Sequence, residues 1–482
     1  MSVAHICDIL VDIQFRKRVE IMSNKNRTEI APIGFAEKLG FGTFSTASNV
    51  VFNFKDLFYL FFLTNVMGLK IQHAGIITAV GILWDAVNDP LVGYWAVNHR
   101  FKNGEMCRPF ALWCAVPWAV TTVLMFTCFD VAYTLKFAIC IVIYFLFELF
   151  NTFAAIPYNS MGSLATNRDA DRRAINVARN LGGCVGSAIG SLALYPLLNL
   201  FGGLDDAGNV LRDADGQRAF FCAAIVMGCV CIFGAFSHYF TTRERVKQEA
   251  EDDSKISFPA AAKMLLSCRS WVINMFYVIC YGMLNLLIMS TINYYATYIL
   301  GSASAATPIL AVFLVVSVIA TICAIPIDKK LGRRKTMIFS ALLYAAGKIW
   351  FVIDPYSMGA IYTNGITVAF SMAIAFVCFN TNRNNIADLV EWKNGRRIDS
   401  LVSTCDNLAS KLAKAGANLL MTSVLAAAGF NAELPVQPQT ALDTICALLG
   451  WVPMIVAGIM LVIVTCHPIE KDMAAMRAEQ AK

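Results

Sequence analysis

Long apolar runs separated by short polar connections extend along almost the whole chain. A helix needs about 20 predominantly apolar residues to cross a bilayer, and about twelve runs reach or approach this length. The pattern therefore predicts an all-α polytopic membrane protein. The expected transmembrane helices are 40–66, 74–97, 109–130, 134–162, 175–202, 218–241, 271–299, 304–326, 336–353, 359–387, 401–430 and 441–466.

A polar stretch of about thirty residues follows the sixth run and divides the expected spans six and six. Two six-helix halves are typical of transporters built from repeats, whose binding site lies near the bilayer midplane between the halves. The expected parts are a cytoplasmic leader (1–38), an N-terminal six-helix bundle (39–241), a central cytoplasmic loop (242–270), a C-terminal six-helix bundle (271–467) and a cytoplasmic tail (468–482).

The charge distribution supports this interpretation. Only 15% of the residues are charged, whereas soluble domains carry about 25%. The net charge of +6 arises from Lys and Arg in the loops after even-numbered spans, while the other loops are nearly free of them. Because cytoplasmic loops are enriched in Lys and Arg, we expect an integral plasma-membrane protein in contact with the lipid bilayer, with both termini in the cytoplasm. Nucleic acid is not an expected partner.

Several other classes of protein are disfavoured. The 16 cysteines lie mostly within apolar runs and show neither disulfide nor zinc spacing. No pairing of a nucleophile with a base, no set of metal ligands and no phosphate-binding loop is recognisable, so we expect neither an enzyme nor a cofactor. Residues 1–30 lack the apolar core of a signal peptide, and translation from Met22 in place of Met1 would leave an ordinary short leader.

Two carboxylates fall inside the second apolar run. Asp85 and Asp89 are four residues apart, so they lie on the same face of the expected helix. Each charge at mid-membrane costs roughly 2.5–3.5 kcal/mol, which indicates a compensating positive partner: a small cation such as Na⁺, a proton, or a basic side chain. Asn88 and the helix-loosening Pro90 favour a cation-binding site formed by Asp85, Asp89 and Asn88. The alternative is a buried ion pair that only fixes packing.

The loop after the eighth span reads Asp328-Lys329-Lys330-Leu331-Gly332-Arg333-Arg334-Lys335. It resembles the loop motif of the major facilitator superfamily, in which glycine permits a tight turn and the aspartate caps a helix or pairs with arginine. We expect gating roles for Asp328, Arg333 and Arg334, together with Asp388 at the end of the tenth span. The alternative is a run of cytoplasmic positive charge without a gating role.

Four stretches in order resemble the glycoside–pentoside–hexuronide:cation symporter family of this superfamily. They include Gly40-Phe41-Gly42 and the run to Leu69, Trp84-Asp85 to Arg108-Pro109-Phe110, Ile156-Pro157-Tyr158-Asn159-Ser160 with Asn176-Val177-Ala178-Arg179, and Ile386-Ala387-Asp388-Leu389-Val390-Glu391-Trp392. The resemblance spans most of the chain from Leu39 to Pro468. It implies the major facilitator fold, a cation-coupled sugar symporter, and Na⁺, Li⁺ or H⁺ bound at Asp85 and Asp89.

The resemblance also implies a sugar site beside the cation. Arg179 matches the family's fifth-helix arginine, and Lys411 matches the eleventh-helix lysine that reaches toward the carboxylates. A mobile ammonium group suits that role, because it can neutralise the aspartates when the cation is absent. Tyr158 and Asn159 lie in the matching part of the fourth helix and are expected to contact the substrate. Lys414 suits an interfacial, snorkelling position.

Departures from the family pattern concern the substrate. Galactoside-type members carry acidic residues where this chain has Ser45 or Asn49 in the first helix and Ala155 in the fourth. The loss of these hydrogen-bond acceptors leaves Arg179 with less competing negative charge, which suits an acidic sugar such as a uronide.

Two intramembrane carboxylates could compensate for this loss. Asp56 lies seven residues after Asn49, and Glu148 lies seven residues before Ala155, so either could replace a missing acidic residue. Alternatively, Lys55 and Asp56 neutralise one another.

We therefore expect an alternating-access symporter that imports a glycoside, pentoside or hexuronide with Na⁺ or H⁺ and works as a monomer. Two other functions stay open at this point. One is transport of a non-sugar solute such as a lysophospholipid, and the other is a non-transporting sensor. The sequence does not distinguish Na⁺ from H⁺ or identify the sugar.

Overall fold

The computed structural model describes residues 31–166, 168–246, 264–394, 399–434 and 436–480. The expected start at Met22 and most of the leader and central loop lie outside this part. The described helices are α2 (Phe35–Asn65), α3 (Ile71–Asn98), α4 (Arg108–Met125), α5 (Tyr133–Ala165), α6 (Asp169–Leu192), α7 (Leu194–Leu200), α8 (Ala214–Thr241), α10 (Arg269–Tyr298), η1 (Ala303–Ala305), α11 (Ala306–Leu331), α12 (Arg333–Ile353), α13 (Met358–Asn394), α14 (Asp399–Ala427), α15 (Gln439–Leu449), α16 (Trp451–Thr465) and α17 (Ile469–Gln480).

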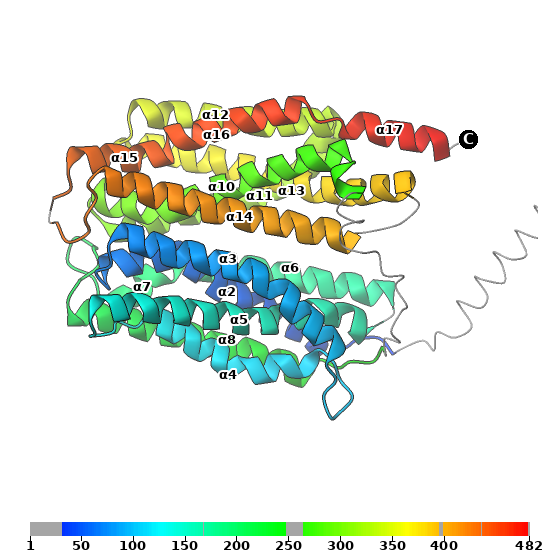
Figure 1. The fold of residues 1–482 in the computed structure, drawn as a ribbon, viewed down its shortest axis with the longest axis horizontal. Coiled ribbons are helices and arrows are strands. Elements are labelled where there is room, and N and C mark those ends of the chain that lie inside the picture. The colour runs from blue at the N-terminus through cyan, green and yellow to red at the C-terminus, as the bar shows by residue number, and fades with distance from the viewer. Residues whose placement is uncertain (1–30, 167, 247–263, 395–398, 435, 481–482) are drawn as a thin grey trace, which may run out of the picture.

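The helices form two groups that lie side by side (Figure 1). Helices α2–α8 pack mainly on one another, as do helices α10–α16, and the groups meet chiefly where α3 faces α14 and α2 faces α10. We call them the N-terminal and C-terminal halves. We keep 39–241 and 271–467 as proposed domain boundaries.

In the described residues, nine helices are long and apolar enough to cross a membrane, or ten if the bent pair α6–α7 counts as one span. Helices α2 and α14, with 31 and 29 residues, are as long as these spans but are not among them. Both carry charged side chains within the bundle, including Lys55 and Asp56 in α2 and Lys411 and Lys414 in α14. The two helices of lower apolarity both bring charge to the interior, as α3 and α5 also do with Asp85, Asp89 and Glu148.

Several expected spans have different limits in the structure. Helix α4 ends at Met125, five residues before the expected end. The fifth expected span is bent by 49° between α6 and α7, around Ala193. The twelfth is interrupted at Gly450, between α15 and α16, and part of the expected tail forms α17.

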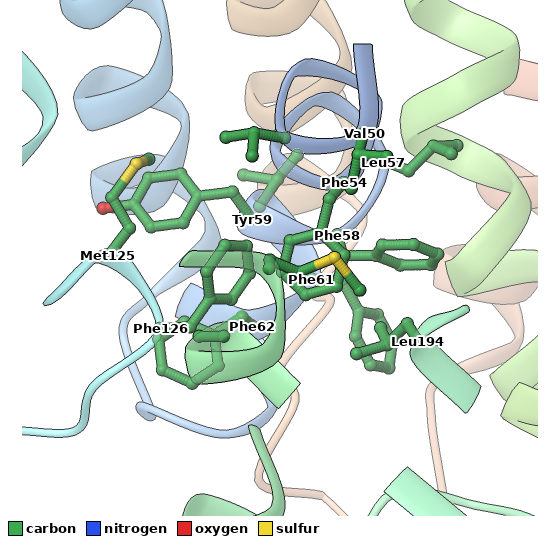
Figure 2. Close-up of a cluster of buried hydrophobic side chains, with 14 of the residues drawn as sticks. Val50, Phe54, Leu57, Phe58, Tyr59, Phe61, Phe62, Met125, Phe126 and Leu194 are labelled. Atoms are coloured by element: carbon green, nitrogen blue, oxygen red, sulfur yellow. The ribbon is translucent and has the colours of Figure 1, made fainter. Parts of the chain in front are cut away.

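Helix α2 is the central element of the N-terminal half. Its aromatic side chains Phe54, Phe58, Tyr59, Phe61 and Phe62 are almost completely buried, and Figure 2 shows them clustered with Met125, Phe126 and Leu194. Lys55 and Asp56 of this helix are tolerated because each has an opposite charge nearby, Glu148 for Lys55 and Lys414 for Asp56.

Helix α6 approaches the other side of α2 closely through three glycines. Gly182, Gly186 and Gly190 recur every four residues, so they form one stripe along α6. A Cβ atom on Gly182, Gly186 or Gly190 would overlap a backbone carbonyl oxygen of α2. Small residues allow helix backbones to approach in this way within a membrane. Thr46 Oγ1 also donates to the Gly182 carbonyl at 3.0 Å.

Several hydrogen bonds between the halves lie at one end of the molecule. Asn293 of α10 donates to the Leu57 carbonyl at 2.6 Å and accepts from Tyr195 at 3.0 Å. Arg212 bonds to the Ala432 carbonyl, and Asn209 donates to the Gly301 carbonyl at 3.0 Å. This end carries the loops that are poor in Lys and Arg, and we call it the expected outer end. Toward the opposite end, α3 and α14 diverge (Figure 1).

At the expected inner end, the segment after α8 is fixed to the N-terminal half. Glu244 accepts hydrogen bonds from the backbone N–H groups of Met106, Cys107 and Arg108 at 2.7–2.9 Å, at the start of α4. Arg245 forms two hydrogen bonds with Glu37, at 2.7 and 2.8 Å. These bonds raise the pKa of the Arg245 guanidinium above its usual value, so the guanidinium stays charged.

Candidate functional site

One ammonium group joins the two expected cation-binding carboxylates. Lys411 Nζ of α14 lies 2.7 Å from Asp85 Oδ2 and 2.5 Å from Asp89 Oδ2, both on α3. Thr152 of α5 donates its hydroxyl toward the other oxygens of the same carboxylates, at 3.4 and 3.2 Å. Lys411 thus occupies the position between Asp85 and Asp89 where a small cation would bind, and it is supplied by the opposite half.

A cavity of about 200 Å³ lies beside this cluster, between the two halves. Asp85 and Lys411 are part of its wall. The remaining lining residues come from α2, α3, α5, α10 and α14: Phe52, Lys55, Asp56, Tyr59, Leu60, Thr78, Ile82, Tyr144, Glu148, Asn285, Leu286, Met289, Ser290, Asn407, Ser410, Lys414 and Asn418. We call it the central cavity. Its mixture of aromatic, amide, hydroxyl and charged groups suits a polar, hydroxylated solute.

A second ion-pair cluster lines the same cavity. Lys55 Nζ lies 2.5 Å from Glu148 Oε1 and 3.4 Å from Asp56 Oδ1. Lys414 Nζ lies 3.5 Å from the other oxygen of Asp56. The Lys55 and Glu148 side chains are 5% and 1% exposed, so their charges are held inside the protein. Asp56, at 31% exposure, is the more accessible of the two carboxylates expected to replace the missing acidic residues.

The charges around the central cavity do not balance. Four carboxylates meet three ammonium groups, so the formally ionised cluster carries one net negative charge. Its members are Asp56, Asp85, Asp89, Glu148, Lys55, Lys411 and Lys414. An uncompensated charge that is partly shielded from water is energetically costly, and a single monovalent cation would neutralise it.

Asn88 has a different environment from the one expected. Its side chain is 2% exposed and donates to the Glu148 carbonyl at 3.2 Å, which joins α3 to α5. Pro90 lies inside α3, which continues through it to Asn98. In this structure the amide of Asn88 therefore stabilises helix packing, and Thr152, which was not singled out in the sequence, lies closer to the aspartates.

The structure places Arg179 outside the central cavity. Its guanidinium donates to the carbonyls of Tyr158 at 2.5 Å and Asn159 at 3.3 Å and stacks over the rings of Phe41 and Tyr158. The Tyr158 hydroxyl donates to the Phe41 carbonyl at 2.7 Å. Arg179, Tyr158 and Asn159 therefore form a separate cluster between α2, α5 and α6.

Asn49 also faces α6, away from the lining residues. Its side-chain amide donates to the Ser45 carbonyl at 2.9 Å. Lys414 differs from its expected position in the opposite sense. The sequence predicts an interfacial position, whereas the structure places its ammonium group in the wall of the central cavity. The spacing of three residues from Lys411 on one helix face could have indicated this.

The expected gating residues lie at the junction of α11 and α12. Arg333 Nη2 pairs with Asp328 Oδ2 at 2.8 Å, and Gly332 adopts a φ of 82° that permits the tight turn. The backbone N–H of Arg334 donates to Glu470 of α17 at 3.0 Å. Asp388 lies on α13, whose inner end packs against α17.

The described residues contain no group of three or more His, Cys, Asp and Glu side chains able to hold a metal ion. A Na⁺ at Asp85 and Asp89 would therefore need other oxygen ligands as well, and the Thr152 hydroxyl is the nearest one that the structure offers.

Comparison with known proteins identifies the family of the chain. Residues 40–471 match the model of the family described as MFS/sugar transport protein. A candidate glycoside/cation symporter of Escherichia coli (strain K12) is 26% identical over 440 residues, which cover 89% of this chain and 91% of that protein. The isoprimeverose transporter of Lactiplantibacillus pentosus is 24% identical over 450 residues, covering 93% and 91% of the two chains.

A solved structure shows the same fold. The inward-facing, unoccupied form of a bacterial homologue of the human lysosomal transporter Spinster superposes with a TM-score of 0.66 at 13% identity, over 92% of this chain and 96% of that one. The family model covers far more than half of the chain. The chain therefore belongs to the MFS/sugar transport protein family, within the major facilitator superfamily.

Proposed function

We propose that this protein imports a glycoside, pentoside or hexuronide together with one Na⁺ or H⁺, which binds at Asp85 and Asp89. The observation that carries the proposal is the position of Lys411 Nζ, 2.7 and 2.5 Å from the two carboxylates. A positive charge is required there, and the protein itself supplies one from the opposite half.

The coupling cation and Lys411 compete for the same carboxylates. When the cation binds, the ammonium group of Lys411 is released toward the central cavity, whose wall it already forms. There it can donate up to three hydrogen bonds to substrate hydroxyls. Cation binding would then raise sugar affinity, and sugar binding would raise cation affinity by the same factor.

The charge balance supports a stoichiometry of one cation. The central cluster carries one net negative charge, so one Na⁺ or H⁺ makes the loaded carrier neutral. A neutral cluster can pass through the closed intermediate more easily than a charged one, because desolvation of an unpaired charge is costly.

Alternating access would proceed by rocking of the two halves around the central cavity. The bonds of Asn293, Arg212 and Asn209 close the expected outer end, so this conformation corresponds to the inward-facing state. For the surroundings, we propose the plasma membrane, with both termini in the cytoplasm, and a monomer.

Counterflow in proteoliposomes tests the function. Proteoliposomes that contain the purified protein are loaded with one unlabelled sugar from a panel of glycosides, pentosides and uronides. Entry of the same sugar in labelled form is then measured with and without Na⁺ at two pH values. Counterflow that increases with Na⁺ supports a sodium site, and dependence on pH alone supports a proton site. Absence of counterflow for every sugar would contradict the proposal and favour another solute, such as a lysophospholipid.

A further inference from the structure

A second cavity of about 420 Å³ adjoins the central cavity on the C-terminal half. The two cavities share the lining residues Asn285, Asn407, Ser410 and Lys414, so a solute in one touches the wall of the other. The other lining residues of the second cavity, which we call the α13–α14 cavity, are Val278, Tyr281, Gly282, Phe376, Phe379, Asn380, Arg383 and Asp406.

An arginine–aspartate pair lies in this wall. Arg383 Nε of α13 is 3.1 Å from Asp406 Oδ2 of α14. The Asp406 side chain is completely buried and its Oδ1 has no hydrogen-bond partner among the described residues, whereas Arg383 is 22% exposed. The buried Asp406 carboxylate therefore contacts the guanidinium at its Nε edge and fixes its position. A guanidinium has five N–H donors in a planar fork, so most of its hydrogen-bonding capacity stays available to the cavity.

The exposed charge of the α13–α14 cavity is positive. Lys414, the other cation in its wall, is 23% exposed, and the one carboxylate that lines it, Asp406, is buried. The central cavity differs, because Asp56, Asp85 and Glu148 contribute negative charge there. An anionic group of a bound solute would therefore be oriented toward Arg383 and away from the central cluster.

The remaining wall suits a hydroxylated ring. Tyr281 and Phe379 form an aromatic surface, with ring centroids 5.1 Å apart, and the Arg383 guanidinium lies over Phe379 at 5.8 Å. Asn285, Asn380, Asn407 and Ser410 supply amide and hydroxyl groups around it. Amides and hydroxyls can both donate to and accept from sugar hydroxyls.

We infer that Arg383 binds the carboxylate or sulfonate of an acidic sugar in the α13–α14 cavity and so determines a preference for acidic over neutral sugars. This inference rests on the proposed sugar transport, and it moves the expected acid-binding role from Arg179 to Arg383. Asp406 is a positioning residue that fixes the edge of the guanidinium, and the bidentate geometry of Arg383 matches an anion with two or three oxygens.

The test uses pairs of methyl glycosides that differ only at C6, where a hydroxymethyl group is replaced by a carboxylate or a sulfonate. Half-saturation concentrations for counterflow are measured in proteoliposomes for the unmodified protein, Arg383→Gln, Arg383→Lys and Arg218→Gln. Arg218 pairs with Asp215 at the exposed start of α8. Arg218→Gln therefore removes one ion-paired guanidinium, as Arg383→Gln does, but among residues that line neither cavity.

We expect the unmodified protein and Arg218→Gln to prefer the acidic member of a pair. In Arg383→Gln, the acidic-to-neutral ratio of half-saturation concentrations should rise about 10- to 100-fold, as expected for the loss of a charge-assisted contact. Arg383→Lys should give a smaller rise, because it keeps the charge without the fork. The carboxylate and sulfonate pairs show which anion the site favours.

Two results would overturn the inference. One is that no acidic sugar is preferred by the unmodified protein. The other is that Arg383→Gln and Arg383→Lys change the half-saturation values for both members equally, as a purely structural ion pair between α13 and α14 would. If Arg383→Gln does not fold, Arg383→Lys and calorimetric binding to the unmodified protein decide the matter. Cation dependence of neutral-sugar counterflow tests the proposed symport separately.

Discussion

Lys411 Nζ on α14 lies 2.7 Å from Asp85 Oδ2 on α3, and this ion pair joins the two halves of the transporter beside the central cavity, together with the pairs Lys411–Asp89 and Lys414–Asp56. The Lys411 and Asp85 side chains are 21% and 14% exposed, which keeps them largely shielded from water but accessible to a small ion. Because the partners belong to different halves, replacing Lys411 by a free cation removes a direct bond between the halves. In the proposed mechanism, cation binding and rocking of the halves are thereby linked.

The first prediction concerns Asp85. Asp85→Asn keeps the size of the side chain but removes one of the two charges that hold the coupling cation. We expect the variant to lose accumulation of sugar against a gradient, while counterflow persists because it needs no net cation movement. Uptake and counterflow in the same proteoliposomes measure both, with Asp206→Asn in an exposed loop as the control. Accumulation that survives in Asp85→Asn would contradict the assigned role.

The second prediction concerns Lys411. In Lys411→Gln the cation no longer competes with an ammonium group, so the half-saturation concentration of the coupling cation should fall by roughly tenfold, which corresponds to about 1.4 kcal/mol. Net uptake should slow, since the cation-free carrier would have to reorient with Asp85 and Asp89 uncompensated. Titration of counterflow with Na⁺ and with pH measures the first effect. Lys471→Gln, at an exposed position of α17, is the control, and an unchanged or weaker cation affinity in Lys411→Gln would oppose the competition model.

The architecture was largely accessible from the sequence. Apolar length and loop charge predict the spans, because a bilayer imposes both on any helix that crosses it. The break at Gly450 and the bend at Ala193 were not predicted, since an apolar run of the same length gives no information about a local change of helix direction. Helices α2 and α14 were predicted as spans although their charges lower their apolarity.

The site was predicted less completely, and the reason is geometric. The spacing of Asp85 and Asp89 is local, so helical periodicity places both on one face. The spacing of Lys411 and Lys414 places both on one face of α14. Which carboxylate of the other half each of them reaches depends on how α14 faces α3 and α2, and the spacing does not give that. The same holds for Arg179, whose guanidinium is held by carbonyls and aromatic rings of its own half.

The third prediction concerns the closed outer end. Asn293 is fully buried and bonds to both Leu57 and Tyr195, so Asn293→Ala leaves buried polar groups unpaired at a cost of about 1–3 kcal/mol. This is enough to shift a two-state equilibrium toward the outward-facing state by about tenfold.

Spin labels on Asp206→Cys and Glu433→Cys, in exposed loops of the two halves at this end, report the shift as a new population of longer distances. Asn103→Ala, in the exposed loop between α3 and α4 at the expected inner end, is the control. Distance distributions that do not differ between Asn293→Ala and the control would argue against Asn293 as part of the closure.

The fourth prediction concerns the contact between α2 and α6. A methyl group at Gly186 would overlap the Thr46 carbonyl oxygen, which cannot move away without displacing the α2 backbone. We expect Gly186→Ala to separate the two helices and to lower stability by about 1–3 kcal/mol, the usual cost of overpacking. The unfolding midpoint of the purified protein in detergent measures this effect.

Gly365→Ala is the matched control, because nothing lies within 4 Å of the added atom on α13. That variant should keep or slightly raise the midpoint, since alanine favours the helix over glycine by about 1 kcal/mol. Helix propensity alone predicts the same gain at Gly186, so the two substitutions separate propensity from packing. Equal midpoints in both variants would mean that α2 and α6 are not held at the close approach that the glycine stripe permits.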